Sequence, residues 1–94
     1  MAPLSTTAIH SAYFEAITYL RENKWKDALD VFKRLVAHFP DGLNAPEAQY
    51  HVGLCLQQLG DRQGAIAAWE ETQKRYPDST WATHAGERLA EIRK

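Results

Sequence analysis

The chain contains five stretches in which apolar residues return every three or four positions, the spacing that places them on one face of an α-helix. In the first stretch, Tyr13, Ile17 and Leu20 fall on one side in this way. The predicted helices run from about Thr6 to Glu22, from Lys26 to Phe39, from near Pro46 to a stop at Gly60 and Asp61, from there to Pro77, and from about Trp81 to Arg93. The pattern therefore predicts an all-α fold.

The breaks between these stretches carry residues that end or begin helices. Asn23 interrupts the first run, Pro40 ends the second, and Gly60 ends the third. Ser79 is a favourable N-cap residue for the last helix, and a hydroxyl among Ser5 to Thr7 can cap the first. These local signals agree with the helices that the apolar pattern predicts.

Two segments of the sequence have the same form, HFPDGLNAPEAQY at 38–50 and RYPDSTWATHAGE at 75–87. Their prolines, Pro40 and Pro77, are 37 residues apart, and the same offset relates many other positions. Residues paired in this way include Tyr13 with Tyr50, Ile17 with Leu54, Ala28 with Ala65, Phe32 with Trp69, Phe39 with Tyr76 and Ala48 with Ala85. The chain is therefore a tandem repeat of a two-helix unit. We expect one domain, 1–94, with repeats at about 6–42 and 45–79 and a polar-sided capping helix at about 81–93.

Each unit carries small and aromatic residues at matching places. In Ala28-x3-Phe32 and in Ala65-x3-Trp69, the aromatic residue stands eight positions before the proline that ends its unit. Gly53 precedes the second of these pairs. In this respect the chain resembles the tetratricopeptide repeat family, whose units carry A-x3-F…P. The resemblance implies a right-handed solenoid of two repeats plus a capping helix, with a concave face lined by the first helix of each unit, and a noncatalytic role in protein binding.

The joint between the two repeats is about three residues longer than is usual for that family. The segment FPDGLNAPEAQYHVG resembles a bacterial subgroup that includes the C-terminal domain of the Tol-Pal coordinator and the outer-membrane assembly lipoprotein. Members of that subgroup are commonly envelope proteins that bind other proteins. The second unit departs from the first, with Thr83 at the place of Pro46 and Gly86 at the place of Gln49.

The resemblance also implies which side chains face a ligand. They are His10, Tyr13, Ile17, Leu20 and Arg21 in the first helix, Glu47, Tyr50, Leu54, Gln57 and Gln58 in the third, and His84, followed by Glu87, in the fifth. We expect a largely apolar groove in which Tyr13 and Tyr50 present their rings to a protein or peptide. The Lys and Asn residues of the family's carboxylate clamp are absent at the matching positions, so capture of a chaperone tail is not expected.

Small residues are expected where helices approach closely. Ala16 and Gly53 are placed where the two helices of a unit cross, and Phe32 and Trp69 fill the space beyond. A bulky side chain at Gly53 is expected to overpack the core. Trp69 is therefore predicted to be a core residue. Trp25 at a helix turn and Trp81 in a joint either staple a helix start or are exposed for binding, and the structural interpretation is favoured.

The first helix has a wider apolar face than one packing side requires, because Phe14 lies beside Tyr13 and Ile17. One interpretation is that Phe14 packs under the second helix while Glu15 lies at an open end of the solenoid. The other is that the first helix exposes a patch for a partner or for self-association. The second interpretation makes a homo-oligomerising scaffold the alternative function.

Charge and composition limit the classes of partner. The chain has 94 residues, 45% of them hydrophobic, and its 11 basic and 12 acidic residues are interleaved. A net charge of −1 without a basic stripe argues against nucleic acid. The N-terminal residues form neither a signal peptide nor a membrane span, so the chain as written is expected in the cytoplasm, or in the periplasm if it is a domain excised from a longer protein.

One pair of residues has the spacing of metal ligands. His51 and Cys55 stand four apart on one helix face, but two ligands do not make a site. We interpret them as a small buried thiol beside a partly exposed imidazole. No residues are predicted to be catalytic, to bind a cofactor or to hold a metal, and the protein is not expected to be an enzyme.

Overall fold

The computed structural model describes the backbone of residues 6–94 and the side chains from Ile9 onward, and within that part it contains five α-helices and no strand. The helices are α1 (Thr6–Arg21), α2 (Trp25–His38), α3 (Ala45–Gln58), α4 (Arg62–Arg75) and α5 (Thr80–Ile92). The predicted all-α solenoid is confirmed. Among the described helices, none combines the length and the apolarity that are needed to cross a membrane.

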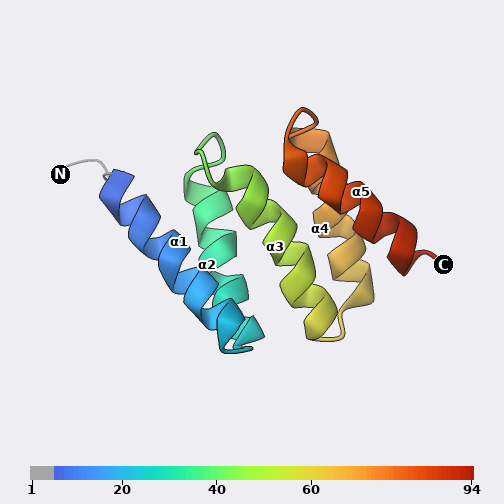
Figure 1. The fold of residues 1–94 in the computed structure, drawn as a ribbon, viewed down its shortest axis with the longest axis horizontal. Coiled ribbons are helices and arrows are strands. Elements are labelled where there is room, and N and C mark those ends of the chain that lie inside the picture. Colours follow the sequence, from blue (N-terminus) through green and yellow to red (C-terminus); the bar gives the residue numbers. More distant parts are fainter. Residues whose placement is uncertain (1–5) are drawn as a thin grey trace.

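The helices stack in chain order. Each one packs against the next, and α3 also touches α5. The result is an elongated body of 48 × 30 × 17 Å, in which α1, α3 and α5 form the nearer row of Figure 1 and α2 and α4 the row behind. The first helix of every unit therefore contributes to one side of the stack.

The helix ends follow the predicted signals. Asn23 and Gly60 adopt positive φ values of 60° and 88° directly after α1 and α3, in the left-handed region that Asn and Gly tolerate best. The Ser79 Oγ accepts a hydrogen bond from the Ala82 N–H at 3.1 Å and so caps α5, as expected. The predicted cap of the first helix lies outside the described residues at Ser5, and outside the described side chains at Thr6 and Thr7.

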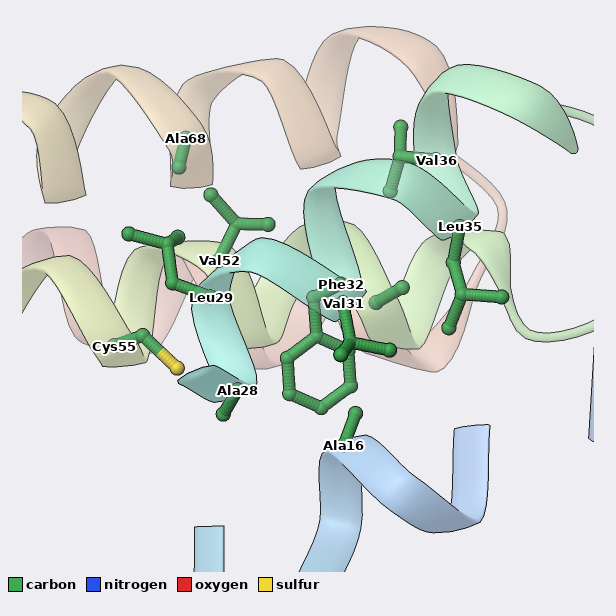
Figure 2. Packing of buried hydrophobic residues seen from close by; sticks show 11 residues of the cluster. Ala16, Ala28, Leu29, Val31, Phe32, Leu35, Val36, Val52, Cys55 and Ala68 are labelled. Carbon is green, nitrogen blue, oxygen red and sulfur yellow. The ribbon is translucent and has the colours of Figure 1, made fainter. Parts of the chain in front are cut away.

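The first part of the core surrounds Phe32, which is fully buried. Figure 2 shows its ring beside Ala16 of α1, with Cys55 and Val52 of α3 nearby. Buried residues of four helices belong to this cluster, since Ala68 of α4 also joins it. Burial at this level is worth roughly 1.5–3 kcal/mol per large apolar side chain, so the cluster joins the two units as well as the helices within each.

The second part of the core surrounds Trp69, which is fully buried as predicted. Its indole Nε1–H donates to the Tyr50 carbonyl at 3.1 Å, so the polar edge of the ring is satisfied. The ring lies against the backbone of Gly53, where a β-carbon would come within 2.4 Å of Nε1. Overpacking at Gly53 is therefore the expected result of any larger residue.

The two joints that share a sequence are tied to each other. The Tyr76 hydroxyl, in the second joint, donates to the carbonyl of Pro40 in the first at 2.6 Å. Burial raises the pKa of Tyr76, which keeps the phenol protonated as a donor. The repeated segment thus has a structural role, because its aromatic residue in one copy holds the loop of the other.

Candidate functional site

The residues that were predicted to face a ligand belong to α1, α3 and α5, and we call them together the first-helix surface. Its exposed members are His10, Arg21, Gln58 and Glu87. Its half-buried members are Tyr13, Ile17, Leu20, Glu47, Leu54, Gln57 and His84. One predicted residue, Tyr50, is buried. The surface is therefore mixed, with apolar side chains that are only partly accessible and polar ones at their edges.

Tyr13 and Glu47 connect α1 to α3 across this surface. The Tyr13 hydroxyl donates to the Glu47 carboxylate, in the first turn of α3. The pKa of Tyr13 is raised well above its usual range by burial, then by this hydrogen bond and by the charge of Glu47. The tyrosine therefore stays neutral and holds the carboxylate in one orientation.

Tyr50 occupies the same place in the second unit but lies in a different environment. Its side chain is only 6% exposed, so the expectation that its ring faces a ligand is wrong. Tyr50 packs near Trp81 and His84 of α5, at ring-centroid distances of 5.2 and 6.1 Å. The cover comes from α5, whose counterpart for Tyr13 is α3, but Trp81 of α5 stands where the first unit has Asn44. The spacing of Tyr50 alone does not show this difference.

The hydroxyl of Tyr50 remains available at the edge of this cover. It accepts a hydrogen bond from the Nε–H of Arg88 at 3.0 Å. Arg88 belongs to the predicted polar-sided capping helix and is exposed, but its guanidinium contacts Tyr50 of the first-helix surface.

Trp81 has a structural role, in agreement with its interpretation. Its half-buried ring lies 5.6 Å from that of His51 and 5.3 Å from that of His84. It thereby joins the start of α5 to the middle of α3. Trp25, the first residue of α2, is half-buried at the start of its helix.

His51 and Cys55 are a buried thiol beside a partly exposed imidazole, as interpreted. The His51 ring stacks on Phe32 at 5.1 Å, and its Nδ1–H donates to the Glu47 carbonyl at 2.8 Å. Burial lowers the pKa of His51, against the opposing effects of the Glu47 carbonyl and charge. Burial raises the pKa of Cys55 to about 11, so its thiol stays protonated at neutral pH.

The exposure of Phe14 in α1 distinguishes between the two interpretations of the wide apolar face of this helix. Phe14 is 67% exposed and touches Tyr13 edge-on, with ring centroids 6.1 Å apart. The interpretation that Phe14 packs under the second helix is therefore wrong, whereas Glu15 is exposed at the open end as that interpretation required. The first helix presents an uncovered aromatic side chain.

A shallow groove that the sequence did not predict lies between α1 and α2, and Ala12, Val31, Leu35 and Phe39 are among its lining residues. The second unit has Gln49 at the place of Ala12, and its amide nitrogen donates to the carbonyl of Ala68 at 3.1 Å. The groove is therefore the space that a longer, hydrogen-bonded side chain occupies one repeat later. The groove results from this difference in side-chain packing between the two units.

Within the part of the chain that the structure describes, no three His, Cys, Asp or Glu side chains come close enough together to hold a metal ion.

Comparison with known proteins agrees with the helical architecture. No curated protein matches the sequence. The family model of the tetratricopeptide repeat matches residues 13–42 and 47–79, which together make up more than half of the chain. Such repeats generally mediate interactions between proteins and are typically noncatalytic. The two matched segments end in the two joints that share a sequence, and the chain belongs to the tetratricopeptide repeat family.

Proposed function

We propose that the first-helix surface binds a peptide segment of a partner protein, in an extended or helical form. The observation that carries the proposal is that three apolar side chains of α1 and α3, Tyr13, Ile17 and Leu54, are only half-buried. A ligand would complete their burial, at roughly 25 cal/mol per Å² of apolar surface removed from water.

The arrangement of this surface favours binding because much of it is already ordered. The hydrogen bond from Tyr13 to Glu47 joins α1 to α3, and the one from Arg88 to Tyr50 joins α5 to α3. A receptor whose side chains are held in place loses less conformational entropy when it binds. We propose that the partner is a component of a bacterial cell-envelope assembly, as the sequence of the joint between the repeats suggests.

The test is a selection from a random-peptide phage library on the folded protein, followed by synthesis of the enriched peptides. Leu54→Arg puts a bulky charge into the middle of the surface, and we expect it to abolish binding. The matched control is Ala67→Arg, at an exposed position of α4 outside the first-helix surface. Circular dichroism checks that both variants keep their helices. Binding that survives Leu54→Arg, or that is lost equally in both folded variants, rules out this surface as the site.

A second candidate function is self-association through α1. The observation in its favour is the ring of Phe14, which is 67% exposed beside Tyr13 and whose apolar surface would be removed from water by contact with another copy. Sedimentation over a range of concentrations tests this idea. A dimer that Phe14→Ser dissociates would support it, and a monomer at every concentration would exclude it.

A further inference from the structure

We propose that the first-helix surface selects peptide segments with two opposite charges, a cationic side chain placed at Glu47 and an anionic one at Arg88, about three residues apart in an extended chain. This inference rests on the proposed function and adds to it the chemistry and the direction of the ligand. It follows from how these two charges are held.

Glu47 is a half-buried carboxylate with an assigned orientation. The Tyr13 hydroxyl donates to one of its oxygens, Oε2. The other oxygen can still accept hydrogen bonds, because an ionised carboxylate has about four acceptor positions. Among the described residues, no Lys, Arg or His nitrogen lies within ion-pair distance of it. Glu47 is therefore a positioned anion with room for a cationic partner.

Arg88 is a positioned cation of the same kind. Its Nε–H is used by the hydroxyl of the buried Tyr50, which leaves the two terminal NH₂ groups of the guanidinium to bind a carboxylate. The acidic residues next to it on α5 have other partners, since Glu87 pairs with His84 and Glu91 with Lys94. No carboxylate lies within ion-pair distance of Arg88 in the described part of the chain.

Glu47 and Arg88 are positioned in the same way, each by a hydrogen bond to a tyrosine side chain of another helix. Tyr13 and Tyr50 are equivalent in the repeat, and each reaches from its own first helix to a charged side chain on the next. Tyr13 is hydrogen-bonded to an acidic side chain and Tyr50 to a basic one. A tyrosine hydroxyl can both donate and accept, so the same ring serves either sign.

The spacing of the two groups sets the spacing in the ligand. Glu47 is on α3 and Arg88 is on α5, which touch each other. Packed helix axes lie roughly 8–10 Å apart. Arg88 also stands four residues beyond His84, the counterpart of Glu47, which adds an offset of about 6 Å along the helix. The two groups are therefore roughly 10–12 Å apart, and an extended chain that advances about 3.3 Å per residue places the two ligand charges about three residues apart. For bound peptides that all lie in the same direction on the surface, the two opposite charges require one order of the basic and the acidic residue.

The experiment compares peptides selected from a random-peptide phage library by the wild-type protein and by the double variant Glu47→Arg with Arg88→Glu. Both substitutions leave a partner for the tyrosine hydroxyl. We expect the wild-type protein to enrich a basic and an acidic residue in one order at this spacing, and the double variant to enrich the opposite order. The matched control swaps an exposed ion pair between α4 and the C-cap of α5, Glu70→Arg with Arg93→Glu, and keeps the wild-type order.

The affinity of one selected peptide, made synthetically, is measured for the wild-type protein and for single variants, and the difference shows how much each charge contributes to binding. We expect Glu47→Gln or Arg88→Gln each to weaken it by about two- to fivefold, as for exposed ion pairs, and added salt to weaken the wild-type complex more than either variant complex.

The outcomes separate this inference from the function on which it rests. Peptides that bind and are blocked by Leu54→Arg, but show no preferred charge order or the same order with the double variant, overturn the inference and leave the binding surface in place. A selection that yields no peptide sensitive to Leu54→Arg overturns both. Enrichment of reversed orders by the two proteins supports both.

Discussion

The backbone of Gly53 lies directly against the indole ring of Trp69, so that a β-carbon on residue 53 would be 2.4 Å from Nε1. The first unit has Ala16 and Phe32 at the two equivalent places. A smaller residue therefore faces the larger ring in one unit, and a larger residue faces the smaller ring in the other. The smaller residue leaves room for the larger ring, as close packing of the interior requires.

Gly53→Ala is expected to destabilise the protein, although alanine is the better helix former by about 1 kcal/mol. The reason is overpacking of about 1–3 kcal/mol against a ring that is fully buried and cannot turn aside. Urea unfolding measures the change, and the loss is expected to shrink in a Trp69→Phe background. Gly86→Ala is the control, since its β-carbon would meet only the flexible amide of Gln73. Equal effects at the two glycines would contradict the packing argument.

Tyr50→Ala is expected to cost about 3–5 kcal/mol of unfolding free energy, because it removes a ring that is 6% exposed from the contact between α3 and α5. Such a variant would report on folding and not on binding. Tyr50→Phe keeps the ring and loses only the bond to Arg88, so we expect a loss of about 0.5–1.5 kcal/mol in thermal or urea unfolding. Similar losses for both variants would show that the ring is not part of the core.

Tyr76→Phe tests the connection between the two joints. The substitution removes the donor to the Pro40 carbonyl and keeps the aromatic ring. The first unit already has a phenylalanine, Phe39, at the equivalent position. We expect a loss of about 1 kcal/mol in urea unfolding and faster amide exchange in residues 40–44. Unchanged exchange in that joint would mean that the hydrogen bond does not hold it.

Stability is expected to fall as the pH drops below about 6.5, the ordinary pKa of histidine. The pKa of His51 is lowered in the folded state, mainly by burial, so in this range the unfolded chain binds a proton that the folded chain does not. The loss grows until the pH reaches the folded-state pKa of His51. Urea titrations at several pH values measure it, and His51→Gln is expected to be less sensitive to acid than the wild-type protein. An equal acid dependence in both proteins would assign the effect to other groups.

Cys55 is expected to react slowly with iodoacetamide in the folded protein. Its thiol is fully buried and its pKa is raised to about 11, so very little thiolate is present at pH 8. The alkylation rate should rise steeply through the urea transition and follow the unfolded fraction. Rapid labelling without urea would show that α3 opens locally around this residue.

Much of the fold was predictable from local patterns. The apolar spacing of each helix, the breaks at Asn23 and Gly60 and the cap at Ser79 act through neighbouring residues in the chain, and all were confirmed. The burial of Trp69 followed from its pairing with Phe32 in the repeat. Such features depend on backbone geometry and short-range packing, which a few consecutive residues already define.

The exposure of individual side chains was decided by helices that are distant in the sequence. Tyr13 and Tyr50 are equivalent in the repeat, yet only Tyr50 is covered, because Trp81 arrives from α5. Phe14 is exposed where its counterpart His51 stacks on Phe32. Arg88 returns to the first-helix surface through a hydroxyl 38 residues away. A repeat unit defines each position, but burial and hydrogen bonding depend on which neighbours surround it, and these differ between the ends of a short stack and its middle.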